Sequence, residues 1–150
     1  MALEKYMAIA GLVLCIFFVA EIFTLFNFMI EPEDNDSFGF EAAPKIFQFV
    51  SLSIAPATIM FSVSFVLSKR YGSRFNGTLI IIGGIIVLVG MSYSYTMIED
   101  LKPTLVDSTV EMTPLIFIGV SIPIIAVGAR LLKIRPRKPK KDYLDDTDRF

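Results

Sequence analysis

Glu21 is the residue of this 150-residue chain best placed to do chemistry, because it is the one charged residue well inside a long apolar run. It lies about three residues beyond the midpoint of residues 6–30, or about 4–5 Å along a helix that rises 1.5 Å per residue. A carboxylate at that depth in a membrane is costly and by default indicates a function. Three interpretations are open. Glu21 is protonated and hydrogen-bonded to a hydroxyl such as that of Ser53 or Ser94, it pairs with a basic group on another subunit, or it cycles a proton.

Other residue types that do chemistry are scarce. The chain has no histidine, which excludes histidine-ligated haem, histidine-based copper or zinc sites and histidine acid–base catalysis. The single cysteine, Cys15, cannot by itself hold a structural zinc ion or an iron–sulfur cluster. Tyr93 and Tyr95 lie near the end of an apolar run, where tyrosines usually anchor a helix at the membrane interface. We therefore predict no catalytic residue, no cofactor and no metal site, and we expect that the chain is not an enzyme by itself.

The elements that must position Glu21 are four apolar runs, at residues 6–30, 46–67, 78–98 and 112–132. Each is long enough to cross a hydrocarbon layer of about 30 Å, which needs about 20 helical residues. The chain is 54% hydrophobic, and the stretches between the runs are too short to form a separate soluble domain. The sequence therefore predicts an all-α integral membrane protein. Residues 1–133 form a four-helix transmembrane bundle and residues 134–150 form a tail.

Basic and acidic residues are sorted between the loops. Lys69, Arg70 and Arg74 lie in the loop of residues 68–77, and more basic residues follow the last run, whereas the other two loops are mainly acidic. Since lysine and arginine near span ends stay in the cytoplasm, we predict a multi-pass protein of the plasma membrane with both termini cytoplasmic. Two glycosylation sequons test this topology: Asn35 is expected outside, and Asn76 is expected inside and unmodified.

The tail begins with a basic run that is broken by prolines, so we expect it to be extended. Such a run beside a span binds anionic lipid headgroups with about 1 kcal/mol per charge. A final acidic stretch follows the basic run. Its docking on the soluble face of a partner protein is a second hypothesis for the function of the tail. We favour the lipid contact. The basic residues are Arg130, Lys133, Arg135, Arg137, Lys138, Lys140 and Lys141.

Small and hydroxyl residues form stripes at helical spacing on three of the runs, and such stripes usually mark helix–helix contacts. The second run has two such faces, which suggests that it is central to the bundle or also contacts a partner protein. Pro56 and Pro123 lie in mid-run, where kinks are expected. The two faces of the second run are Ser51, Ala55, Thr58 and Ser62, and Ser53, Ala57, Ser64 and Ser68; the later runs carry Gly83, Gly90 and Ser94, and Gly119 and Ala126.

Two functions from different classes fit these observations. The first is a non-catalytic accessory or structural subunit of a larger multi-subunit membrane complex, whose partners are other membrane protein subunits and the lipid bilayer. The second is a small proton-coupled transporter or ion pathway centred on Glu21, with the four-span plan and single first-span glutamate of small multidrug transporters. No feature of the chain predicts a nucleic acid partner.

The overall plan of the chain also resembles a known group of proteins. Four spans, acidic outer loops, the segment Arg135-Pro136-Arg137-Lys138-Pro139-Lys140-Lys141 and a final acidic stretch are similar to small helical accessory subunits of archaeal ammonia monooxygenase complexes. The resemblance implies membership of a copper-dependent membrane complex whose metal ligands lie on other subunits. The absence of histidine agrees with that division.

Overall fold

The computed structural model describes residues 3–31, 41–69, 72–101, 103 and 106–134. Four helical stretches are long and apolar enough to cross a membrane, as predicted: Leu3–Ile30, Ala42–Ser68, Arg74–Asp100 and Ser108–Lys133. Their elements, in chain order, are α1 (Leu3–Ile30), α2 (Ala42–Phe49), the π-helical turn η1 (Val50–Ile54), α3 (Ala55–Ser68), α4 (Arg74–Met97), the 3₁₀ turn η2 (Ile98–Asp100) and α5 (Ser108–Lys133).

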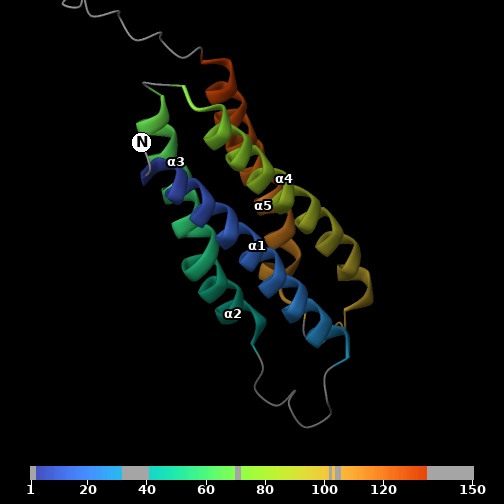
Figure 1. Ribbon diagram of the computed structural model, residues 1–150. Helices are drawn as coiled ribbons and strands as arrows, with labels where there is room; N and C mark the ends of the chain where they lie inside the picture. Colours follow the sequence, from blue (N-terminus) through green and yellow to red (C-terminus); the bar gives the residue numbers. More distant parts are fainter. Residues whose placement is uncertain (1–2, 32–40, 70–71, 102, 104–105, 135–150) are drawn as a thin grey trace, which may run out of the picture.

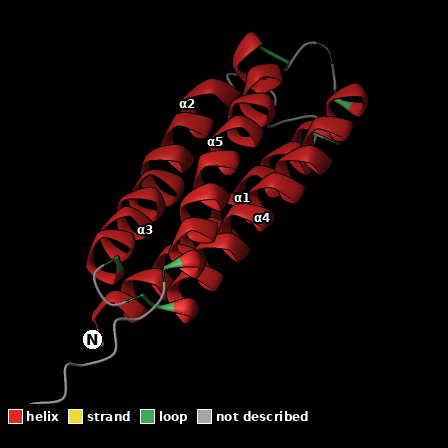
Figure 2. Ribbon diagram, turned by 90° about the horizontal axis from the view of Figure 1, so that it is seen from above, coloured by secondary structure: helices red, strands yellow, loops and turns green. Residues whose placement is uncertain are grey.

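The spans lie side by side in antiparallel order, with α1 between two neighbours (Figure 1). α1 packs against α3 and α4, and the most extensive contact in the bundle joins α4 to α5. α3 makes few contacts with α4 or α5. Figure 2 shows the same arrangement from a second direction, with α2 and α3 along one side. The second span therefore packs mainly against α1 and is not the central helix, while the other expectation for it, contact with a partner protein, stays a prediction.

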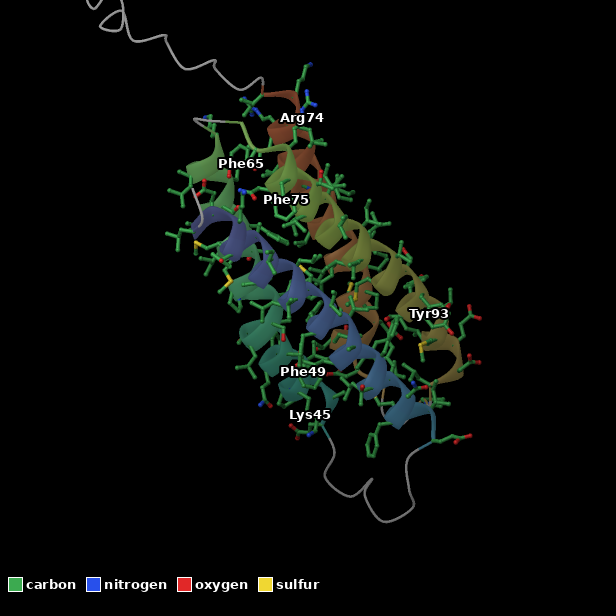
Figure 3. The ribbon with its side chains drawn as sticks, in the orientation of Figure 1. Lys45, Phe49, Phe65, Arg74, Phe75 and Tyr93 are labelled. Atoms are coloured by element: carbon green, nitrogen blue, oxygen red, sulfur yellow. The ribbon has the colours of Figure 1, made fainter. Side chains whose placement is uncertain are left out.

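Basic and acidic residues are concentrated at opposite ends of the bundle. The start of α1, the end of α5 and the connection between α3 and α4 lie at one end (Figure 1), which we call the basic end; Arg74 lies there in Figure 3. The opposite end, which we call the acidic end, is where α1 and η2 stop and α5 starts, and Glu31, Glu99 and Asp107 lie in those segments. The described parts of both terminal helices thus share one end. That this end faces the cytoplasm remains a prediction from charge.

All four helical stretches begin three or four residues before their apolar runs, and polar side chains cap the starts of two of them. α4 begins at Arg74, where the Ser73 side chain accepts a hydrogen bond from the Asn76 backbone N–H at 3.3 Å. α5 begins at Ser108, whose N–H donates to Asp107 Oδ1 at 2.8 Å. A side-chain oxygen at a helix start satisfies a backbone donor that has no partner within the helix. Both caps lie beyond the boundary that hydropathy alone indicates, and α2 begins four residues before its apolar run with no side-chain cap hydrogen bond.

One phenylalanine of α3 packs at the centre of the bundle, between α1 and α4. Phe61 of α3 is buried, and its ring lies against Gly11 of α1 and Gly83 of α4. A Cβ atom on Gly11 would lie 2.7 Å from the ring, and one on Gly83 would lie 2.6 Å from it. Both distances are shorter than van der Waals contact, so only glycine leaves room for the ring at these two positions. These two glycines thus let one side chain of α3 reach both α1 and α4.

Candidate functional site

Glu21 lies on α1, is half-buried, and accepts a hydrogen bond from the second span. Ser53 Oγ of the second span donates to Glu21 Oε2 at 2.7 Å, and Ser53 itself is buried. Ser94, the other hydroxyl considered from the sequence, is also buried but donates to the Gly90 carbonyl at 3.0 Å. The structure thus brings Glu21 together with Ser53 and not with Ser94.

A local change of helix type accompanies the placement of Ser53 opposite Glu21. Pro56 lacks an N–H, and its ring would collide with the carbonyl of Leu52 in a regular α-helix. The chain forms the π-helical turn Val50–Ile54 immediately before α3, with Pro56 in the first turn of α3. A π turn holds one extra residue and rotates the side chains that precede it relative to those that follow. Ser53 and Ile54 are the buried residues of this turn.

Glu21 opens into a groove of about 610 Å³ between α1 and α2. One wall is a stripe on α1 in which residues follow one another at helical spacing, and the other wall is Lys45 and Phe49 of α2. Lys45 and Phe49 lie toward the acidic end in Figure 3. The α1 residues that line the groove are Phe17, Ala20, Glu21, Thr24, Leu25 and Phe28. Lys45, which the sequence places in a loop before the second run, thus shares a groove with Glu21.

The groove opens on the side of the bundle and not along its axis. Phe18, Ile22 and Phe26, which are neighbours of Glu21 on α1, are fully buried and apolar. Phe18 packs edge-to-face on Phe117 of α5 with ring centroids 4.7 Å apart. Ala20 and Thr24 of the groove wall are exposed. The carboxyl group of Glu21 therefore faces outward, and closely packed apolar side chains separate it from the centre of the bundle.

The residues predicted to pack helices divide into an inward and an outward set. Gly83, Gly90 and Ser94 of α4 are buried, as is the whole second face of span two, which comprises Ser53, Ala57, Ser64 and Ser68. On the first face of span two, Ala55 and Thr58 are half-buried, while Ser51 and Ser62 are exposed. Gly119 and Ala126 of α5 are exposed, and a Cβ on Gly119 would meet no atom within 4 Å.

Sequence reasoning missed two inter-helix contacts near the basic end. A Cβ on Gly77 of α4 would lie 3.0 Å from the Gly128 carbonyl oxygen of α5. A Cβ on Gly128 would likewise lie 3.0 Å from the Gly77 carbonyl oxygen. The backbones of α4 and α5 are therefore nearly in contact there. Both glycines can be read from the sequence, but neither is among the small residues that we assigned to the helix-packing stripes.

The second missed contact is a buried polar pair. Asn76 Nδ2 donates to Ser68 Oγ at 2.6 Å, and both side chains are fully or almost fully buried. Asn76 Oδ1 has no hydrogen-bond partner among the described residues. Asn76 also belongs to the inner sequon, and burial is a second reason for it to stay unmodified. Asn76 therefore no longer tests topology, and Asn35 lies outside the described residues.

The remaining predicted residues form no reactive cluster in the described part of the chain. Cys15 is buried, and Tyr93 packs edge-to-face on Phe23 at 5.5 Å on the outside of the bundle. Within the described ranges, no group of three or more histidine, cysteine or acidic residues is placed to hold a metal ion. Arg130 and Lys133 are exposed in the last turn of α5. The other basic residues of the tail, Arg135, Arg137, Lys138, Lys140 and Lys141, lie outside the described residues.

Comparison with protein families, with curated proteins and with solved structures finds no match to this chain.

Proposed function

We propose that this protein is a non-catalytic accessory subunit of a larger multi-subunit membrane complex. One observation carries the proposal: Glu21 is an intramembrane carboxyl group that opens on the side of the bundle, into the groove between α1 and α2. Exposure of such a group to lipid tails is unfavourable because the tails offer no hydrogen bond. A neighbouring subunit that covers the groove removes this cost.

The outward face of α5 supports the same proposal. Gly119, Pro123 and Ala126 are exposed on this helix, and small residues on a membrane helix allow a second helix to approach closely. Pro123 has no N–H to give to the Gly119 carbonyl four residues earlier. That carbonyl is an acceptor for a donor on a neighbouring chain. The bundle thus has surfaces for neighbours on more than one side.

The resemblance to accessory subunits of archaeal ammonia monooxygenase complexes suggests what kind of complex this is. We propose a membrane monooxygenase in which other subunits hold the metal, and this chain contributes packing surfaces. The absence of histidine from the sequence supports this division of roles. The separation of charges between the two ends of the bundle supports a plasma-membrane location with both termini in the cytoplasm.

A second function has one specific observation in its favour. The groove of about 610 Å³ places a carboxyl group beside three phenylalanines and Lys45, and this is enough space for a small amphiphilic substrate. Two copies that face each other through this groove would form a proton-coupled transporter centred on Glu21. The apolar core behind Glu21 argues against a pathway through a single bundle.

The experiment that separates the two functions is the native mass of the protein after extraction in mild detergent, with identification of the proteins that co-purify. A stable complex with different membrane proteins is expected. A homo-oligomer that loses proton-coupled flux in the Glu21→Gln variant would refute the accessory role. In the complex, we expect Glu21→Gln to leave assembly largely intact, because a glutamine fills similar space and still accepts from Ser53. Loss of the complex in this variant would indicate an ion pair across the interface.

A further inference from the structure

We infer that α2 exists in two registers relative to α3, and that the hydrogen bond from Ser53 to Glu21 holds the register seen in the structure. In the second register the π-helical turn Val50–Ile54 becomes a regular α-helical turn, and α2 advances by one residue. The second span is then a conformational device within the bundle, whatever chain covers the groove.

The two halves of the second span differ in how tightly they are packed. On α3 the buried ring of Phe61 lies against Gly11 and Gly83, which fixes this half to α1 and α4. On α2, which continues the line of α3 (Figure 1), the buried residues are Ala42 and Ile46. A groove lies on each side of α2, one of about 610 Å³ next to α1 and one of about 400 Å³ next to α5. The helix α2 therefore has room to turn about its own axis, and α3 does not.

The π turn converts to an α turn without a large change of the backbone. The Ala55 N–H donates to the Val50 carbonyl, five residues earlier, whereas in a regular α-helix it donates to Ser51, four residues earlier. The φ and ψ angles of Phe49, Val50, Ile54 and Ala55 are all in the right-handed helical region. An exchange of hydrogen bonds is therefore sufficient. It turns α2 by about 100° and moves it about 1.5 Å along its axis.

The sequence of α2 suits both registers. Since the π turn holds one extra residue, each α2 residue takes the place of the preceding residue when that turn is lost. Ala43 then occupies the buried place of Ala42, and Phe47 occupies that of Ile46, beside the groove that Phe47 already lines. Both exchanges keep an apolar residue inside. Residues that turn outward meet lipid tails, which are as apolar as the packed side, so hydropathy does not choose between the registers.

The register decides which side chain lies in the groove across from Glu21. Lys45 lines that groove in the structure. In the second register Ile46 takes the place of Lys45, and Lys45 moves to the exposed place of Pro44. The wall that α2 contributes to the groove thus changes from a cationic to an aliphatic side chain.

Two features favour the register seen in the structure. The ring of Pro56 collides with the Leu52 carbonyl in a regular α-helix, and the π turn avoids this collision. Ser53 lies inside the turn and donates to Glu21 Oε2 at 2.7 Å, so a change of the turn moves this hydroxyl relative to α1. The hydrogen bond therefore couples the register of α2 to Glu21. A group that displaces Ser53 from Glu21 shifts α2 toward the second register.

The test measures thiol labelling of Ala42→Cys and Ala43→Cys in the full chain in membranes. Ala42 is buried and moves to the exposed place of Glu41 in the second register, whereas Ala43 moves from a half-buried place to a buried one. A register shift therefore speeds labelling at position 42 and slows it at position 43, while fraying of α2 speeds both. The chain without an added cysteine gives the background, since Cys15 is buried.

We expect Ser53→Ala and Glu21→Ala each to speed labelling at position 42 at least about threefold and to slow it at position 43. Glu21→Gln keeps an acceptor for Ser53 and is the matched control, with labelling as in the wild type. Deletion of Leu52 removes the extra residue of the turn, so Ser53→Ala in that background should leave both rates unchanged. The inference is overturned if both rates rise together in Ser53→Ala and Glu21→Ala, if neither rate changes, or if the deletion background responds as the full-length chain does.

Discussion

The near-contact between α4 and α5 at Gly77 and Gly128 makes a sharp prediction about Gly128→Ala. A Cβ atom at position 128 would lie 3.0 Å from the Gly77 carbonyl oxygen, 3.0 Å from the Ile81 backbone nitrogen and 2.7 Å from Ile81 Cγ1. Two of these three neighbours are backbone atoms, which cannot move aside by a change of rotamer. The methyl group can therefore be accommodated only if the two helices separate. We expect Gly128→Ala to lower the free energy of unfolding.

The size of the effect follows from two opposing contributions. Alanine is favoured over glycine inside a helix by about 1 kcal/mol, and forcing extra volume into a packed contact costs about 1–3 kcal/mol. The net destabilisation is therefore about 0–2 kcal/mol. Gly119→Ala on the same helix has the same helix preference but meets no atom within 4 Å. The helix preference cancels in the difference in unfolding free energy between the two variants. That difference therefore gives the packing cost, about 1–3 kcal/mol.

The measurement is unfolding of the purified chain in mixed micelles as the denaturing detergent is increased, followed by far-ultraviolet circular dichroism. Gly119→Ala is expected to be as stable as wild type or more so, and Gly128→Ala is expected to unfold at a lower denaturant fraction. Equal unfolding curves for the two variants would refute the close backbone approach. If instead only Gly119→Ala is destabilising, then α5 packs through the opposite face.

Three further predictions concern buried side chains. Ser53→Ala removes the donor to Glu21 and is expected to destabilise the chain by about 1–2 kcal/mol, read from the same unfolding experiment. Phe61→Ala empties the space between α1, α3 and α4 and should cost about 3–5 kcal/mol, with a loss of α3 protection in amide hydrogen exchange. Ser68→Ala leaves the Asn76 amide without its acceptor in a buried site and should cost about 1–3 kcal/mol, again read from unfolding.

Each of these variants has a control on the same span. Ser51→Ala and Ser62→Ala remove exposed hydroxyls that donate to Phe47 and Thr58 carbonyls within their own span, so both should stay close to wild-type stability. Ile59→Ala removes a side chain that is 63% exposed and is the comparison for Phe61→Ala. If the exposed and buried members of a pair prove equally destabilising, the inward face of the second span has been assigned incorrectly.

Part of the site could be predicted from sequence. Glu21 was identified because a charge inside an apolar run stands out, and Ser53 was one of two hydroxyls proposed as its partner. The choice between Ser53 and Ser94 could not be made, because it depends on the rotation of each helix about its own axis. The π-helical turn before Pro56 changes that rotation within the second span. The groove with Lys45 was missed for a related reason: α2 begins at Ala42 and so brings Lys45 onto a helix beside α1.

The sequence alone determined the four spans and the separation of charges between their ends. Both depend on the cost of moving polar groups into hydrocarbon, and that cost acts on each segment independently of its neighbours. Only the tertiary structure decided which faces meet. In a membrane the lipid-facing side of a helix is as apolar as the packed side, so hydropathy does not distinguish them. The contacts of Gly128 with Gly77, of Phe61 with two glycines, and of Glu21 with Ser53 depend on shape and on hydrogen bonds between segments far apart in the chain. They exist only once the helices are assembled.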